Sequence, residues 1–193
     1  MQSLDSSSRG KSLLIFILGA LTALGPFSID MYLPGFDSIA KDLGVTTAEV
    51  GLSLSSYFIG ISAGQLLYGP LLDRFGRKKP LYIGLCLYIL TSAMVHSLQG
   101  LVILRFFQAI GSCAAAVAAI AMVRDLFPVQ ENARVFALLM LVVGASPMIA
   151  PTVGGYVTLA LGWHSVFIIL GVLGVMILLA SIFLLPESYE PDV

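Results

Sequence analysis

The sequence predicts an all-α membrane protein with six transmembrane helices. Of its 193 residues, 58% are hydrophobic and only 11% are charged, whereas soluble domains carry about 25% charged residues. Mean hydropathy is +0.98. A bilayer core of about 30 Å needs about 20 mostly apolar residues per helix. Six stretches meet this need, some only with their flanking residues: Ser12–Pro34, Glu49–Leu72, Pro80–His96, Leu101–Val123, Val135–Ala160 and His164–Leu185.

The first stretch shares one property with a secretory signal peptide, because Arg9 and Lys11 precede an apolar run. The run is long, however, and it ends at Asp30–Pro34 without the small-residue pattern of a cleavage site. We therefore interpret it as an uncleaved first helix.

The basic residues predict the orientation of the helices. With six spans, Lys41 falls on one side and Arg105 inside a span, and the other eight basic residues share the opposite side. The positive-inside rule places these eight in the cytoplasm, together with both termini. We expect a cytoplasmic tail at 1–11, a six-helix bundle at 12–185 and a second cytoplasmic tail at 186–193. The eight residues are Arg9, Lys11, Arg74, Arg77, Lys78, Lys79, Arg124 and Arg134.

Charge and motif content exclude several other classes. Ten basic residues against eleven acidic ones give a net charge of −1, which argues against a nucleic-acid partner. There is no phosphate-binding Gly-x-x-x-x-Gly-Lys run and no cluster of cysteine and histidine. We therefore expect no enzyme activity, metal or other cofactor, and a lipid bilayer as the first partner.

Two charged residues lie inside predicted spans, where a charge costs about 2.5–3.5 kcal/mol on insertion scales. Asp30 precedes the end of the first span at Pro34 by four residues, and Arg105 lies five residues past Gly100. Both are then about 6–8 Å from the outer helix ends, so they can pair if their helices are neighbours. An aspartate that alternates between an arginine and an apolar environment can bind and release a proton. The alternative is a static pair that only helps the helices to pack.

Polar side chains inside the spans predict a substrate cavity. Gln108 and Ser112 come three and seven residues after Arg105, so the three share one helical face. Such a face should turn toward a cavity rather than toward lipid. Tyr57 and Gln65 in the second span are further candidates. Hydrogen bonding between helices, worth about 0.6 kcal/mol on average, is the alternative for these side chains.

Small residues and prolines predict where helices approach or bend. Gly60 and Gly64 form a small-xxx-small pair in the second span. In the fifth span, two prolines four residues apart remove two backbone donors and predict a bent helix. Flanking glycines predict tight packing there. The residues concerned are Gly144, Pro147, Pro151, Gly154 and Gly155.

The predicted cytoplasmic turn after the second span holds the strongest local pattern. Gly76 permits a tight turn, and Asp73 can accept from Arg77 or from a neighbouring helix N-terminus. The turn resembles the signature of the major facilitator superfamily, G-x-L-x-D-R-x-G-R-K-x-x-L. The matching residues are Gly69, Leu71, Asp73, Arg74, Gly76, Arg77, Lys78 and Leu81.

Other stretches extend this resemblance from about Leu13 to Glu187. Leu104–Gly111 resembles the family's fourth-helix motif, and Gly144–Gly155 resembles the fifth-helix motif of its antiporter branch, with Ser146-Pro147 in place of Gly-Pro. A narrower resemblance, to the Bcr/CflA group of bacterial multidrug efflux transporters, is carried by Ser28–Pro34, Tyr68-Gly69-Pro70 and Gly162-Trp163-His164.

The resemblance implies drug/proton antiport across the bacterial inner membrane, driven by the proton gradient. It implies that Asp30 is the protonation site and Arg105 its coupling partner. The fifth-helix glycines and prolines would prevent leakage, and Asp73 and Arg77 would gate the cytoplasmic side. The substrate would be a small-molecule drug or metabolite.

The family has twelve helices in two halves, each a three-plus-three inverted repeat, and this sequence matches the first half. We therefore expect a truncated product, a fragment, or a half that pairs with a second six-helix half or with itself. A membrane fragment that does not transport is the main alternative function. An intramembrane serine protease is a remote one, suggested by Gly144-Ala145-Ser146 and by His96 and His164.

Overall fold

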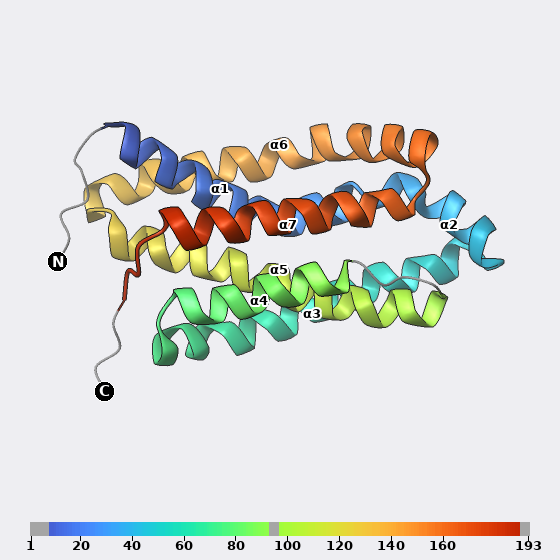
Figure 1. Ribbon diagram of the computed structural model, residues 1–193, viewed down its shortest axis with the longest axis horizontal. Coiled ribbons are helices and arrows are strands. Elements are labelled where there is room, and N and C mark those ends of the chain that lie inside the picture. Colours follow the sequence, from blue (N-terminus) through green and yellow to red (C-terminus); the bar gives the residue numbers. More distant parts are fainter. Residues whose placement is uncertain (1–7, 93–96, 190–193) are drawn as a thin grey trace.

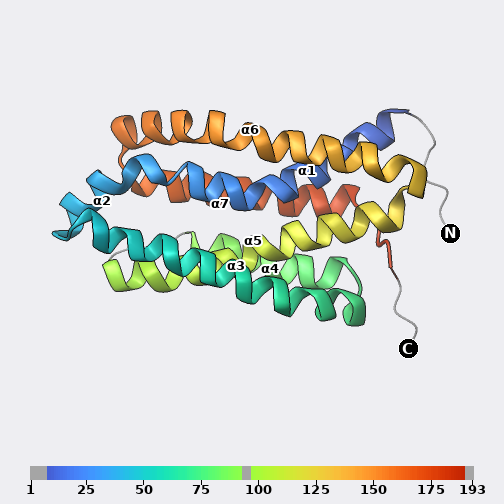
Figure 2. The ribbon, with the colours of Figure 1, turned by 180° about the vertical axis from the view of Figure 1, so that it is seen from behind.

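The structure, a computed structural model, describes residues 8–92 and 97–189, and every regular element in these ranges is a helix (Figure 1). The elements run along one another as a bundle whose long axis follows the helices (Figures 1 and 2). In chain order they are α1 (Ser8–Asp30), η1 (Leu33–Gly35), α2 (Phe36–Leu43), α3 (Thr47–Phe75), α4 (Lys78–Thr91), α5 (Leu98–Leu126), α6 (Val129–Leu161) and α7 (His164–Leu184).

Five of the helical segments described are long and apolar enough to cross a membrane. They are Gly10–Leu43, which holds most of α1 together with η1 and α2, and helices α3, α5, α6 and α7. The third predicted span, Pro80–His96, corresponds to α4, which has 14 residues. Residues 93–96 of that span, His96 included, lie outside the described residues. The all-α membrane architecture is confirmed.

The first helix ends earlier than expected. The sequence places Asp30 about four residues inside a helix that reaches Pro34, but α1 ends at Asp30 and a turn leads to η1. Pro34 has no backbone N–H to donate to the carbonyl of Asp30, and proline disfavours helical geometry in the residue before it. Asp30 is therefore a helix-terminal residue.

The starts of α3 and α5 follow ordinary capping rules. Thr46 and Glu49 form a capping box at the start of α3, in which the backbone N–H of Thr46 donates to Glu49 Oε2 over 2.8 Å. Ser97 Oγ accepts from the backbone N–H of Gly100 at the start of α5. These caps satisfy backbone donors that a helix end leaves free.

Close packing centres on α5, which runs between α3, α4 and α1. A Cβ on Gly60 would lie 2.5 Å from the backbone oxygen of Phe106, and one on Gly64 would lie 2.8 Å from the Cβ of Cys113. The close approach predicted from the small-xxx-small pair is therefore confirmed, and its partner is α5.

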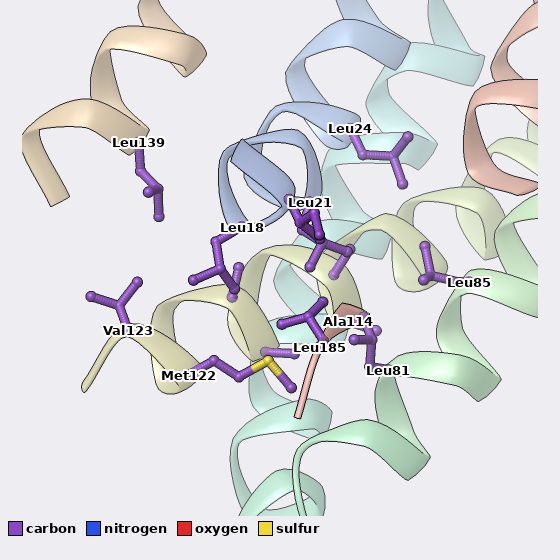
Figure 3. Close-up of a cluster of buried hydrophobic side chains, with 14 of the residues drawn as sticks. Leu18, Leu21, Leu24, Leu81, Leu85, Ala114, Met122, Val123, Leu139 and Leu185 are labelled. Carbon is purple, nitrogen blue, oxygen red and sulfur yellow. The ribbon is translucent and has the colours of Figure 1, made fainter. Parts of the chain in front are cut away.

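An apolar core fills the bundle around α5 (Figure 3). It joins leucines of α1 and α4 to small residues of α5, and side chains of α6 and of the segment after α7 complete it. The side chains labelled in the figure are Leu18, Leu21, Leu24, Leu81, Leu85, Ala114, Met122, Val123, Leu139 and Leu185.

The two ends of the bundle differ in charge. The start of α1, the turns α3–α4 and α5–α6 and the end of α7 lie at one end, and α2 and the turn α6–α7 lie at the other (Figures 1 and 2). The first end holds the basic run Arg77–Lys79 together with Arg124, whereas Lys41 is in α2.

Candidate functional site

Arg105 of α5 is buried among three aromatic side chains. Its side chain is 1% exposed. The guanidinium carbon lies 4.2 Å from the ring centroid of Tyr57, 4.4 Å from that of Tyr32 and 6.0 Å from that of Phe167. Aromatic faces attract cations, more strongly when water is excluded. The three rings therefore replace part of the hydration that burial removes from Arg105.

The hydrogen bonds of Arg105 use only one of the three nitrogens of its guanidinium. Nη1 donates to the backbone carbonyl of Ser28, 3.2 Å away, and to Gln108 Oε1, 2.8 Å away. Nε and Nη2 have no partner among the described residues. A buried charge without a full set of partners is expensive. The free N–H groups can therefore bind an acceptor that reaches them.

Hydroxyl and amide groups surround the arginine and connect four helices. Gln108 Nε2 donates to Ser92 Oγ over 2.8 Å. Tyr57 Oη lies 3.0 Å from Ser112 Oγ, and Ser28 Oγ lies 2.6 Å from Tyr88 Oη. The structure thus gathers four of the predicted polar residues, Tyr57, Arg105, Gln108 and Ser112, into one buried cluster.

Gln65 lies apart from this cluster. It is exposed on α3, and the eight residues between Tyr57 and Gln65 correspond to about 12 Å along the helix. The structure therefore brings three of the four predicted cavity residues together and leaves Gln65 on the surface of α3.

Asp30 is half-buried at the end of α1, and its Oδ2 accepts from Ser146 Oγ of α6 over 3.0 Å. In the described part of the chain no ion pair within 4.0 Å joins it to Arg105, although α1 and α5 are neighbours. The reason lies in the helix geometry. Two residues turn a helix by about 200°, so Ser28 faces Tyr88 of α4 while Asp30 faces α6.

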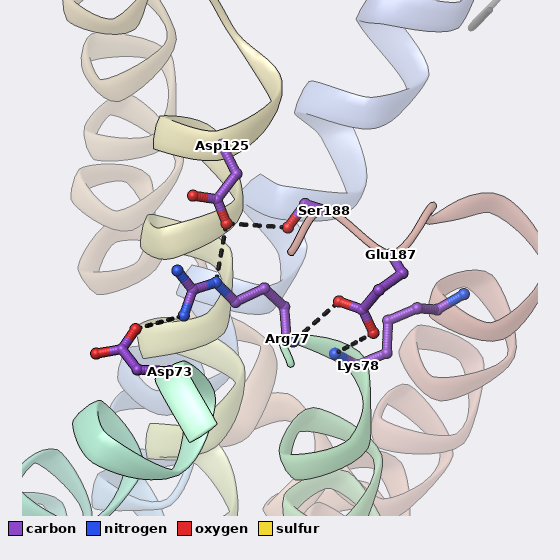
Figure 4. Close-up of polar contacts among 6 residues, drawn as sticks. All are labelled: Asp73, Arg77, Lys78, Asp125, Glu187 and Ser188. Carbon is purple, nitrogen blue, oxygen red and sulfur yellow. Dashed lines mark hydrogen bonds and ion pairs between the residues drawn. The ribbon is translucent and has the colours of Figure 1, made fainter. Parts of the chain in front are cut away.

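The turn between α3 and α4 holds a second polar cluster, built around Arg77 (Figure 4). Nη1 of Arg77 lies 2.7 Å from Asp73 Oδ1, and Nε lies 2.8 Å from Asp125 Oδ2 at the end of α5. Burial alone would lower the pKa of Arg77, but the hydrogen bonds to Asp125 and Asp73 outweigh burial and raise it. The predicted contact between Asp73 and Arg77 is present, and Asp125 is an addition.

The segment after α7 completes the same cluster (Figure 4). Glu187 accepts from the backbone N–H groups of Arg77 and Lys78, over 2.9 and 3.2 Å. Its carboxylate thereby satisfies donors at the start of α4, where the helix dipole favours a negative charge. Ser188 donates to Asp125, and the ring of Tyr189 lies 4.5 Å from the guanidinium carbon of Arg77.

Three other residues of the predicted turn motif, Gly69, Arg74 and Gly76, have surroundings that differ from one another. Gly76 has φ +83°, a backbone conformation open mainly to glycine. Arg74 is exposed and lies over the ring of Phe75. A Cβ on Gly69 would have open space around it.

Helix α6 runs without interruption through Pro147 and Pro151. A Cβ on Gly154 would collide with the backbone oxygen of Met31, so α6 approaches the end of α1 closely here. Gly155 lies beside Pro34, and Gly144 faces open space. Of the three glycines in the predicted motif, Gly154 is therefore the one at which α6 packs tightly against the end of α1.

The serine of the protease alternative has no histidine partner among the described residues. Ser146 donates to Asp30, and His164 stacks on Trp163 with ring centroids 3.6 Å apart. His96 lies outside the described residues. A nucleophile of this kind needs a base within hydrogen-bond reach, so this geometry gives the protease alternative no support.

Comparison with known proteins gives three findings. The family model described as Major Facilitator Superfamily matches residues 15–193. The chain is 41% identical over 180 residues to an uncharacterized MFS-type transporter, YdgK, of Bacillus subtilis, covering 91% of this chain and 45% of that protein. It is 36% identical over 187 residues to a bicyclomycin resistance protein homolog of Haemophilus influenzae, covering 94% and 47%.

Among solved structures, the proton:xylose symporter XylE superposes with a TM-score of 0.82 at 15% identity, covering 94% of this chain and 46% of that one. At this identity the likeness shows the fold alone. The chain spans about half the length of the curated relatives it matches.

Proposed function

Because the chain belongs to the major facilitator superfamily, and is thereby a multi-pass membrane protein of a transporter family, we propose that it forms half of a proton-coupled multidrug efflux transporter. The transporter exchanges a proton that enters the bacterial cell for a small-molecule drug that leaves it. Similarity to a bicyclomycin resistance protein homolog supports a drug as the substrate.

The observation that carries the proposal is the state of Arg105. A guanidinium that is 1% exposed, with two of its three nitrogens unpaired among the described residues, is costly to maintain in a membrane bundle. It contacts the last turn of α1 through the carbonyl of Ser28, and Asp30 ends that turn. Ser28 and Asp30 are two residues apart in α1, so a rearrangement of this helix end would change the interaction between the two charges.

Proton binding at Asp30 then controls which partner Arg105 prefers. A deprotonated Asp30 attracts the free N–H groups of the guanidinium. A protonated Asp30 loses that attraction and keeps its hydrogen bond to Ser146, while Arg105 remains among the aromatic rings. Because Asp30, Arg105 and Ser146 belong to three different helices, the exchange changes how α1 packs against α5 and α6. This coupling connects protonation to helix movement.

The cluster around Arg77 acts as the gate at the other end of the bundle. Asp73, Asp125 and Glu187 connect the turn α3–α4 to the end of α5 and to the segment after α7. These contacts hold three elements together and must rearrange when the bundle opens at this end. The basic residues at this end favour a cytoplasmic position, with both termini inside.

A second six-helix half, or a second copy of this chain, is the proposed partner. Helices α3 and α6 expose apolar side chains along much of their length, including Leu66, Met148 and Tyr156. These faces are suited to a helical partner within the membrane. The drug would bind between the two halves, next to the cluster around Arg105.

The test measures drug-driven proton movement in vesicles that contain the purified chain, with its mass in detergent determined in parallel. We expect bicyclomycin to drive proton release, and Asp30→Asn to abolish it while the protein still inserts. Asp37→Asn is the matched control, because Asp37 is an exposed aspartate of α2. Coupling that is unchanged in Asp30→Asn removes Asp30 from the mechanism. A chain that inserts with the mass of two copies but never moves protons supports the non-transporting alternative.

A further inference from the structure

A groove of about 350 Å³ lies between α4 and α7, away from the faces of α3 and α6. Ile89 and Ser92 line it on the side of α4. On α7 the lining residues form one stripe, with the spacing of a single helical face. They are Phe167, Ile168, Gly171, Val172, Val175 and Met176.

Two glycines of α7 give the groove its shape. A Cβ on Gly174 would lie 2.9 Å from a ring atom of Tyr88, so α7 touches α4 at this level. One turn closer to the start of α7, a Cβ on Gly171 would lie 3.5 Å from the Cβ of Ser92, which is an ordinary contact. The helices therefore meet at Gly174. One turn nearer the start of α7, Gly171 has no side chain, so the space beside it stays open.

The length of the groove matches one leaflet of a bilayer. From Phe167 to Met176 the helix rises about 14 Å, and the hydrocarbon of one leaflet is about 15 Å thick. Phe167 follows the start of α7 at His164 by three residues, or about 4.5 Å. With the start of α7 placed at the membrane surface, the groove runs from just below that surface to the middle of the bilayer.

The groove is continuous with the lipid-facing surface of the bundle. Ile168, Val172 and Met176 are 61%, 54% and 59% exposed, and they form one wall of the groove and the neighbouring surface of α7. In a multi-pass membrane protein, the acyl chains of the lipids surround such a surface. Ser92 contributes the one hydroxyl group of the lining, and it already accepts from Gln108.

We propose that an acyl chain of one bound phospholipid occupies this groove. The inference goes beyond the proposed function. In the proposed orientation the start of α7 is on the outer side, which places the groove in the outer leaflet. Two lining residues connect the lipid to the buried cluster: Ser92 through Gln108, and Phe167 through its ring next to Arg105. The acyl chain therefore supports the packing of side chains that surround Arg105.

The test uses vesicles of phosphatidylethanolamine that carries a photoactivatable diazirine at the middle of one acyl chain. After illumination, peptide mass analysis locates the labelled residues. We expect the label to concentrate on the stripe from Phe167 to Met176. Gly171→Leu should lower labelling there at least about tenfold, since leucine fills the space that the acyl chain needs. Gly171→Ala should retain the label.

Two controls keep the result interpretable. Leu179→Phe changes an exposed residue of α7 outside the groove and should leave the label on the stripe unchanged. If Gly171→Leu does not insert, Val172→Trp fills the same groove from its open wall. Even labelling along the whole exposed surface of α7 overturns the proposal, because it indicates passing lipids. A groove without label beside a labelled surface also overturns it, because another protein segment then covers the groove.

Discussion

Arg105 donates to the backbone carbonyl of Ser28 over 3.2 Å and thereby reaches the last turn of α1 without touching the carboxylate that ends it. A backbone carbonyl carries only a partial charge, so this bond compensates the guanidinium incompletely. Gln108 Oε1 and the neighbouring rings of Tyr32 and Tyr57 add to its attraction. The bundle therefore keeps a buried cation that makes no ion pair within 4.0 Å among the described residues.

Replacing Arg105 by an apolar residue should abolish transport without lowering the stability of the protein. In Arg105→Met the buried charge and its unpaired N–H groups disappear, while the stem of the side chain keeps most of its packing. Exchange of buried ionic groups for apolar ones is often neutral or stabilising by about 1–4 kcal/mol. We expect the melting temperature in detergent to be unchanged or higher, and drug-driven proton release to be lost. A large drop in melting temperature would contradict this account and assign Arg105 a structural role.

Two glycines of α6 should respond in opposite directions to the same substitution. In Gly154→Ala the new methyl group collides with the backbone oxygen of Met31, and overpacking of this kind costs about 1–3 kcal/mol. In Gly144→Ala the methyl group meets open space, and alanine favours a helix over glycine by about 1 kcal/mol. Thermal unfolding of the two variants in the same detergent measures the difference. Equal effects would contradict the close approach of α6 to α1.

Much of the architecture could be predicted from local patterns. Apolar length predicts the spans, and the turn motif offers Arg77 as one of two partners for Asp73. Pro34 carries the signal that ends α1 at Asp30, because the missing N–H belongs to the residue that would have bonded to Asp30. This signal was available in the sequence, although apolar length alone points to a helix that reaches Pro34.

The partners of Arg77 and Arg105 depend on how helices are arranged in space. Asp125 is 48 residues from Arg77, and Glu187 is 110 residues away. No local spacing connects such positions. The rings around Arg105 are equally hidden, because tyrosine and phenylalanine do not stand out in a sequence that is 58% hydrophobic.

The two carboxylates that bind Arg77 should contribute unequally to stability. The side chain of Asp73 is 72% exposed, and that of Asp125 is 20% exposed. Exposed ion pairs contribute about 0–1 kcal/mol, whereas loss of one member of a buried pair is far more costly. We expect Asp125→Asn to lower the melting temperature clearly and Asp73→Asn to change it little. Unfolding in detergent checks the order, and a reversed order would contradict the contact with α5.

Three glycines with positive φ can distinguish two effects at Gly76, in the turn α3–α4. One is backbone strain, and the other is contact with the segment after α7. Gly76 and Gly162 have nearly the same conformation, with φ +83° and ψ 173° against φ +84° and ψ 161°. This region is almost closed to other residues, and occupying it costs about 1–3 kcal/mol. Gly44, at φ +66° and ψ 34°, lies in the milder left-handed helical region, where alanine costs about 1–2 kcal/mol.

Alanine at the three positions should therefore destabilise the protein in a fixed order. Gly44→Ala should cost least, and Gly162→Ala should cost more because its backbone is less accessible to alanine. Gly76→Ala should cost most, since its Cβ also lies 3.2 Å from the backbone oxygen of Tyr189 and presses on the segment that holds Glu187. Unfolding free energies of the three variants in one detergent give the order. If Gly76→Ala and Gly162→Ala cost the same, backbone strain alone explains Gly76, and the segment after α7 does not brace the turn.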